Sequence, residues 1–179
     1  MVSTPPADRR AVRNAALPWL APCRDAPLVG EVRGPGSKAQ TNRALILAAL
    51  GDGPSVLTRP LRSRDTLLMA QALTSLGTKI THESMVWTIS PADLADATSA
   101  TVDCGLAGTV MRFVPLVASL TSADVTFDGD EHARVRPMST TIATLRDLGV
   151  EIDDEGRGSL PFVVHGAGPV PYAHLSPPQ

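Results

Sequence analysis

"RGPGSKAQTNRALILAAL", residues 33–50, joins a glycine-containing turn to an apolar helix, and two cations lie where that helix begins. Lys38 follows Pro-Gly-Ser, and Arg43 lies five residues further on. The stretch is not a P-loop, because that motif needs a glycine directly before the lysine and a serine or threonine directly after it. A helix start nevertheless offers unpaired backbone N–H groups and a partial positive charge. Together with Lys38 and Arg43, this turn predicts an anion site.

The sequence around this helix repeats itself once. Each copy has a first helix, a β-type run, an arginine-bearing loop, a second helix that ends at Leu-Gly, and two short strands. The glycines of the two Leu-Gly pairs, Gly77 and Gly149, suit the left-handed position that follows a helix. The predicted helices are 42–50, 65–77, 109–120 and 138–149, and the predicted strands are 55–60, 79–84, 85–90, 125–129, 150–154 and 161–166.

A strand before each first helix would complete the repeated unit as β-α-β-α-β-β. The candidates are residues 28–34 in the first copy and residues 101–105 in the second. Two copies of one unit predict an α/β fold in which the units stack and share a core. The first helices are apolar on nearly every side, which predicts burial of Leu45, Leu47 and Val114.

Small and basic residues also mark the turns of the second copy. Gly108 has no Cβ to hold a ligand away, and Thr109 is expected to cap the helix that follows. Arg112 lies in the first turn of that helix, and Arg134 and Arg136 follow the next β-type run. Singly, each of these cations is explained as solvated surface. Because they occur at corresponding turns of both copies, they predict a small substrate with several negative charges.

Composition limits the other classes of function. The chain has 179 residues, 43% of them hydrophobic, and a net charge of −2, so no excess of positive charge predicts binding to nucleic acid or an acidic membrane. The spacing of Cys23 and Cys104 is not that of a disulfide framework, so the chain is expected in the reducing cytoplasm. The four histidines are not spaced like the ligands of a metal ion; they are His82, His132, His165 and His174.

Three motifs resemble the family of 3-phosphoshikimate 1-carboxyvinyltransferase, the EPSP synthases, and most closely its actinobacterial members. These motifs are "PGSKAQTNRALILAAL" (35–50), "CGLAGTVMRF" (104–113) and "DGDEHARVRPM" (128–138). The sister transferase that acts on UDP-N-acetylglucosamine has a different lysine-asparagine motif, so the residues at 35–50 argue against membership of that family. The resemblance implies an enolpyruvyl transferase-like lobe, an inside-out α/β barrel with helices inward and sheets outward, of whose usual repeats this chain has two.

The resemblance also implies a reaction. Members transfer the carboxyvinyl group of phosphoenolpyruvate to the 5-hydroxyl of shikimate 3-phosphate, in the cytoplasmic shikimate pathway to chorismate and the aromatic amino acids. The hydroxyl adds to C2 of phosphoenolpyruvate, and the tetrahedral intermediate then loses phosphate. The reaction implies a cluster of cations and no metal or organic cofactor. Nucleic acid and membrane are not expected partners.

Site residues follow by matching positions. The resemblance implies that Lys38 is catalytic and contacts both substrates, and that Arg43 binds shikimate 3-phosphate. Gly108 and Thr109 match the helix start beside phosphoenolpyruvate, and Arg136 matches an arginine that binds it.

Further positions of the resemblance are less uniform. Arg112 and Arg134 match basic positions that line the same cleft. Ala39 stands at a substrate-binding position where the family normally has a serine, whose hydroxyl contacts shikimate 3-phosphate. Leu106 stands where the family often has an asparagine. The serine's absence implies the loss of one hydrogen bond, worth about 0.5–1.5 kcal/mol.

The expected organisation is an extension at 1–27, a family domain at 28–168 and a proline-rich tail at 169–179. The family domain divides into repeats of about 28–98 and 99–168. Because members are more than twice this long, the chain is expected to be a fragment that lacks the second lobe, and to show no turnover alone. Two hypotheses stay open: an enzyme completed by a separately encoded C-terminal half, or a non-catalytic remnant or anion-binding module. Turnover by the chain alone, near that of a full-length relative, would overturn this expectation and would require catalytic acids among four residues: Asp65, Asp128, Asp130 and Glu131.

Overall fold

The structure is a computed structural model that describes residues 26–27, 29–31, 34, 36–83 and 85–168. The chain divides into two units, residues 1–34 and 35–179, and all helices and strands named below belong to the second. The expected strand at 28–34 is wrong for residues 29–31 and 34, which lie outside any strand; residues 28, 32 and 33 are outside the described residues. The expected tail at 169–179 and nearly all of the expected extension at 1–27 are also outside them.

The first repeat contains two helices and one antiparallel sheet. Its elements are α1 (Lys38–Ala49), β1 (Ser55–Thr58), α2 (Arg64–Ser75), β2 (Lys79–Glu83) and β3 (Val86–Ser90). The strand order is β1-β3-β2, with β3 in the centre. A short 3-10 helix, Leu94–Asp96, leads to the second repeat.

The second repeat has the same plan with one strand and one helical turn more. Its elements are β4 (Ala100–Asp103), α3 (Gly108–Ala118), β5 (Asp124–Asp128), α4 (Glu131–Arg134), α5 (Ser139–Asp147), β6 (Glu151–Asp153) and β7 (Phe162–His165). The strand order is β4-β5-β7-β6, in which β4 runs parallel to β5 and the other pairs are antiparallel.

The two repeats correspond element by element. The order β5-β7-β6 matches β1-β3-β2, so α3 is the counterpart of α1, and α5 is the counterpart of α2. This confirms the duplication predicted from the sequence. The strand β4 has no counterpart beside β1 among the described residues. The arginine-bearing loop of the second copy contains the one-turn helix α4.

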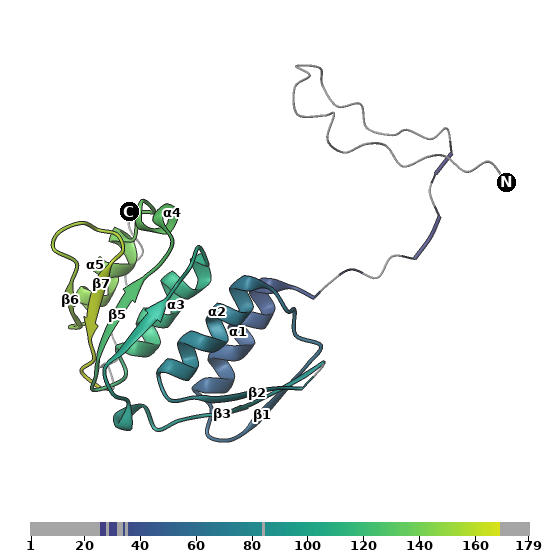
Figure 1. The fold of residues 1–179 in the computed structure, drawn as a ribbon, viewed down its shortest axis with the longest axis horizontal. Coiled ribbons are helices and arrows are strands. Elements are labelled where there is room, and N and C mark those ends of the chain that lie inside the picture. Colours follow the sequence, from purple (N-terminus) through teal and green to yellow (C-terminus); the bar gives the residue numbers. More distant parts are fainter. Residues whose placement is uncertain (1–25, 28, 32–33, 35, 84, 169–179) are drawn as a thin grey trace, which may run out of the picture. The chain divides into compact units, whose positions relative to one another are not determined.

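Figure 1 shows α1, α2 and α3 side by side, with the first sheet along one side of this helix layer and the second sheet along the other. Alternate side chains of the central strands β3 and β5 are buried, which is the expected pattern for half-buried strands. Trp87 and Ile89 of β3 are buried, as is Phe127 of β5. The ring of Phe127 stacks on that of Phe162, with 5.2 Å between the ring centroids. Both sheets therefore contribute to the core around the helices.

The helix ends follow local sequence signals. Gly77 and Gly149 follow α2 and α5 with φ of 99° and 87°, as predicted. The Ser37 side chain accepts a hydrogen bond from the Gln40 N–H and caps α1. None of the helices in the described ranges is long and apolar enough to cross a membrane.

The predicted burial of the first helices is correct for two of the three residues named. Leu45 and Val114 are fully buried, but Leu47 is 72% exposed. α1 packs against α2, α3 and β3, and these neighbours cover its Leu45 side. The prediction for Leu47 is wrong because apolar character all round a helix does not determine which side is covered.

Candidate functional site

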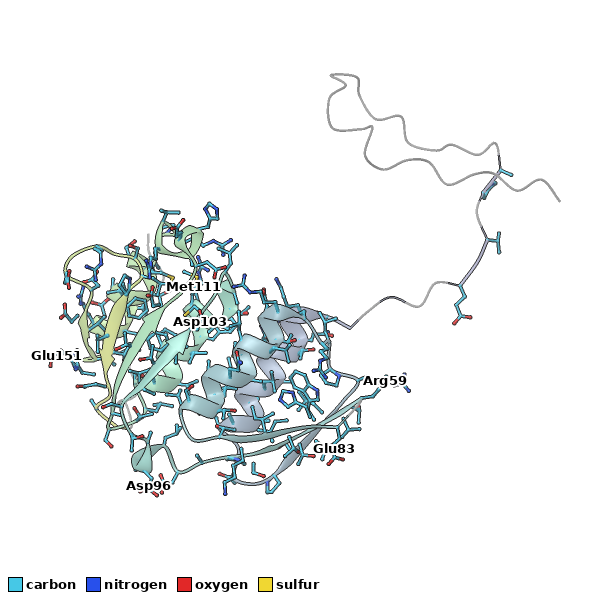
Figure 2. The ribbon with its side chains drawn as sticks, viewed as in Figure 1. Arg59, Glu83, Asp96, Asp103, Met111 and Glu151 are labelled. Carbon is cyan, nitrogen blue, oxygen red and sulfur yellow. The ribbon has the colours of Figure 1, made fainter. Side chains whose placement is uncertain are left out.

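A polar pocket of about 380 Å³ lies at the N-terminal ends of α1, α2 and α3. The first repeat contributes one cation and one acid to it, and the second contributes two cations and a helix start. The lining residues are Lys38, Asp65, Leu106, Gly108, Thr109, Arg112, Phe113 and Arg136. Figure 2 labels Asp103, at the end of β4, and Met111, in the first turn of α3, both away from Asp96, which precedes β4.

The first repeat places Lys38 at the first position of α1. The turn before α2 is tied to this helix, because the Thr41 hydroxyl accepts a hydrogen bond from the Leu61 N–H at 3.0 Å. The Lys38 Nζ donates to Asp65 Oδ2 at 2.8 Å, and their side chains are 52% and 24% exposed, respectively. The charge of Lys38 is therefore paired at the mouth of the pocket while two ammonium protons remain for another acceptor.

A capping box fixes the start of α2 and with it the position of Asp65. The Ser63 side chain accepts a hydrogen bond from the Thr66 N–H, and the Thr66 hydroxyl accepts one from the Ser63 N–H at 2.9 Å. The Thr66 hydroxyl also donates to the Leu61 carbonyl at 2.7 Å. Because the cap satisfies the helix start, the Asp65 side chain is available to Lys38.

The start of α3 lies beside the two arginines of the pocket. Arg112 Nη1 donates to the Gly108 carbonyl at 3.3 Å, and Arg136 Nη1 donates to the Leu106 carbonyl at 3.2 Å. A Cβ added to Gly108 would lie 3.0 Å from Arg112 Nη1 and 3.5 Å from Arg136 Nη1. The glycine therefore keeps open the space in front of both guanidinium groups.

The predicted cap at Thr109 is wrong. The N-cap of α3 is Ala107, and no side chain of the described residues caps this helix. Thr109 lies inside the first turn, and its hydroxyl accepts a hydrogen bond from Asn42 Nδ2 at 2.6 Å. Asn42 is fully buried, and its Oδ1 has no hydrogen-bond partner in the described part of the chain. The Asn42–Thr109 pair joins α1 to α3 behind the pocket.

Five of the predicted site residues thus meet in one pocket, and three lie elsewhere. The five are Lys38, Gly108, Thr109, Arg112 and Arg136. Ala39 is partly buried and Arg43 exposed on α1, where Arg43 lines a separate groove. Arg134 makes a two-point contact with Asp128, at 2.8 and 2.6 Å. The hydrogen bond from Arg134 holds the pKa of Asp128 below its usual range.

The sequence predicts Asp65 only as one candidate catalytic acid in case the chain turns over alone, and it does not predict the ion pair of Asp65 with Lys38. The two residues lie 27 positions apart, and the pairing depends on how α1 and α2 pack. One available signal was the position of Asp65 two residues after the capping Ser63. A second ion pair, from Arg64 to Asp130 at 2.7 and 2.8 Å, joins the two repeats and lowers the pKa of Asp130.

Two other pockets differ in chemistry. An apolar groove of about 390 Å³ lies between α1 and α3 and includes Leu47, Leu116 and Arg43. A pocket of about 600 Å³ beside α2, β2 and β4 contains His82 and Asp103. The His82 ring stacks on Trp87, and burial lowers its pKa. Neither pocket gathers several cations.

Within the described residues, no three His, Cys, Asp or Glu side chains lie close enough to hold a metal ion. Cys104 is buried, and this burial raises the pKa of its thiol to about 12. A thiol of such high pKa stays protonated at neutral pH and is a poor nucleophile. Cys23 and His174 lie outside the described residues.

The fold and the site define a repeated α/β protein with a cationic pocket at the starts of its helices. The family profile described as EPSP synthase (3-phosphoshikimate 1-carboxyvinyltransferase) matches residues 23–176. The chain therefore belongs to the EPSP synthase family.

Relatives and solved structures agree with this assignment. Curated 3-phosphoshikimate 1-carboxyvinyltransferases of Kocuria rhizophila and Mycobacterium ulcerans, both actinobacteria, are 49% identical over 162 and 157 residues, which is 86% of this chain and 36% of each relative. An EPSP synthase structure from Acinetobacter baumannii aligns with a TM-score of 0.71 at 25% identity, over 79% of this chain and 33% of that chain. The chain thus spans about a third of the length of the relatives it matches.

Proposed function

We propose that this protein takes part in carboxyvinyl transfer from phosphoenolpyruvate to the 5-hydroxyl of shikimate 3-phosphate, in the cytoplasmic shikimate pathway. The observation that carries the proposal is the pocket in which Lys38, Arg112 and Arg136 meet the start of α3. Family membership supports the reaction. The matching names of the relatives at 49% identity support the substrates.

The charges of the substrates explain why such a pocket is needed. Each substrate carries a phosphate and a carboxylate, so the two repel each other when they bind together. One pair of like unit charges 4 Å apart costs about 4 kcal/mol at an effective dielectric constant of about 20. The three pocket cations and the backbone N–H groups of the α3 start offset this repulsion.

The proposed binding roles follow the geometry. Arg136 and the Gly108–Thr109 turn hold phosphoenolpyruvate, because Gly108 leaves the space in front of the arginines open. Lys38 lies at the edge of the pocket and bridges the two substrates. Arg112 lines the same pocket.

The roles assigned to Ala39, Arg43 and Arg134 rest on the resemblance alone. None of the three is among the residues that line the pocket. Ala39 and Arg43 are proposed for shikimate 3-phosphate, and Arg134 for the wall of the cleft.

In the proposed reaction the 5-hydroxyl oxygen forms a bond to C2 of phosphoenolpyruvate, the hydroxyl loses its proton, and C3 gains one. The tetrahedral intermediate then breaks its C2–O bond to phosphate as C3 loses a proton, which restores the double bond. Atoms and electrons balance with proton transfers alone, and we propose that no metal or organic cofactor takes part. Lys38 is the proposed catalytic residue, because its ammonium group stabilises negative charge on both substrates.

A non-catalytic anion-binding module is the second candidate. The observation that favours it is the pocket, in which three cations meet a helix start, an arrangement that binds anions. In the catalytic alternative, the part of the relatives' length that lies outside the matched residues supplies the other face of the substrates and excludes water, which strengthens the charged contacts.

Phosphate release from phosphoenolpyruvate and shikimate 3-phosphate separates these candidates. The chain should be assayed alone and together with a polypeptide that carries the remaining length of the Mycobacterium ulcerans relative. We expect no turnover alone and turnover with the added polypeptide. Lys38→Ala should then reduce turnover at least about a hundredfold, because one cation serves two anions. Turnover that survives Lys38→Ala would overturn the catalytic assignment, and phosphoenolpyruvate binding without turnover in the mixture would favour the binding module.

A further inference from the structure

Asp65 is an acid in a pocket built for anions. Its carboxylate lines the same space as Arg112 and Arg136 and lies 2.8 Å from Lys38 Nζ. A carboxylate at this place repels any anion that enters. The proposed substrate binding gives it no role, so its presence needs a separate explanation.

Stabilisation of the α2 start is the simplest explanation, because an acid in the first turn of a helix interacts favourably with the helix dipole. The structure gives that task to other groups. Ser63 and Thr66 form a complete capping box at the same helix start. The Asp65 side chain instead contacts a cation of another helix and is only 24% exposed. Its contact with Lys38 is therefore the feature to explain.

We propose that the Asp65 carboxylate is the counter-charge of Lys38. It pairs with the ammonium group before an anion binds, and it competes with the bound anion for that group. This proposal rests on the proposed anion-binding function of the pocket. Three cations and one carboxylate give the pocket a net charge of about +2 in place of +3. An anion that binds Lys38 then shares the ammonium group with the Asp65 carboxylate or displaces that carboxylate, so a phosphate group binds less tightly and leaves faster. Asp65 thereby sets the affinity for phosphate groups, including the phosphate that the reaction releases.

Asp65→Asn is a suitable test because the amide oxygen can still accept the hydrogen bond from Lys38 while the charge is lost. Inorganic phosphate and phosphoenolpyruvate are the probes, with dissociation constants and dissociation rates measured at several salt concentrations. We expect both anions to bind about tenfold more tightly and to dissociate more slowly, since one repulsive charge is removed. Affinity should also fall more steeply with salt than in the wild type.

Three controls separate this effect from a general one. Asp52→Asn makes the same change in net charge beyond the C-terminal end of α1, a helix of 12 residues and therefore about 18 Å long. This variant should leave affinity unchanged. Asp65→Glu keeps the charge and should retain weak binding. In a Lys38→Ala background, Asp65→Asn should give a clearly smaller gain. Thermal unfolding of each variant confirms that the chain is folded.

The outcomes are distinguishable from failure of the proposed function. If the wild type binds neither phosphate nor phosphoenolpyruvate, the anion pocket itself is wrong. If the wild type binds and Lys38→Ala weakens binding, but Asp65→Asn leaves affinity equal or lower, the counter-charge role is overturned and the pocket stands. An equal gain with and without Lys38 would also overturn it, since the gain would then not act through Lys38.

Discussion

The two repeats share one backbone plan and place different chemistry at equivalent turns. In the first repeat, α2 begins behind the Ser63 capping box and carries Asp65 in its first turn. In the second repeat, the equivalent helix α5 begins at Ser139 without a side-chain cap among the described residues, and Arg136 precedes it. An acid in the first turn of α2 and an arginine just before α5 thus come to the same pocket from the starts of equivalent helices.

The first helices of the two repeats differ in the same way. α1 is capped by Ser37 and presents Lys38. α3 begins after Ala107 with no side-chain cap from the described residues, and it presents the backbone of Gly108. Duplication explains why the elements correspond, and the turns explain the chemistry. The comparison teaches that the pocket needs both repeats, because neither contributes more than part of its charge.

The largest expected effects test whether the repeats share one core. Trp87 in the first sheet and Phe127 in the second are both fully buried. Replacing either by alanine should cost about 3–5 kcal/mol of unfolding free energy, since a large buried side chain leaves a cavity. Because one cluster of buried residues joins both sheets, each variant should lower protection from hydrogen exchange in both repeats. Loss confined to the mutated repeat would show two independent units and break the comparison.

A smaller effect is expected from the connection between the last two strands of the second repeat. Asp154 is buried and accepts hydrogen bonds from Arg146 at 2.8 Å and from the Gly158 and Gly156 N–H groups at 2.7 and 3.2 Å. Chiefly because of Arg146, the pKa of Asp154 lies below its usual value. In the first repeat, β2 ends at Glu83 and β3 begins at Val86.

A lowered pKa means that Asp154 stabilises the fold above the unfolded-state pKa of about 3.9, and that this stability is lost as the pH falls through the folded-state value. Asp154→Asn should lower the unfolding free energy by about 1–3 kcal/mol at pH 7. The difference from the wild type should shrink as the pH falls below about 4. Urea unfolding at a series of pH values measures this, and a difference that does not change with pH would contradict it.

The smallest effect concerns the start of α1. Ala39→Ser would place a hydroxyl next to Lys38, where the family normally has one. We expect shikimate 3-phosphate to bind more tightly by about 0.5–1.5 kcal/mol, the value of one added hydrogen bond. Calorimetric titration measures the change, and inorganic phosphate serves as a control ligand that should be less affected. An equal gain in affinity for both ligands would contradict the proposal that the residue at position 39 contacts shikimate 3-phosphate.

The architecture could be predicted from the sequence because its signals are local. The helical patterns, the β-type runs and the glycines after α2 and α5 predicted the duplicated unit and nearly all of its elements. The exposure of Leu47 could not be predicted, because it depends on which elements cover α1. The start of α3 at Gly108 made Thr109 a residue of the first turn, where its hydroxyl contacts Asn42 of α1.

The sequence predicts the cations that line the pocket, but it does not predict the acid that pairs with one of them. Lys38, Arg112 and Arg136 stand at turns where a helix start attracts anions, and this can be seen in the sequence. The pairing of Lys38 with Asp65 depends on the packing of α1 against α2, which no local pattern specifies. The pairing of Arg134 with Asp128 could have been considered, since the two residues flank the same turn.

The most direct test of the central claim is a titration of the isotopically labelled chain with phosphoenolpyruvate, followed by NMR. The claim is that both repeats together form one anion pocket. We predict saturable shifts of the backbone amides of Lys38, Gly108, Thr109 and Arg136 with a single dissociation constant, which weakens as salt is added. Arg136→Ala should weaken the response at Lys38 in the other repeat as well. Shifts confined to one repeat, or centred on the pocket around His82, would contradict the account.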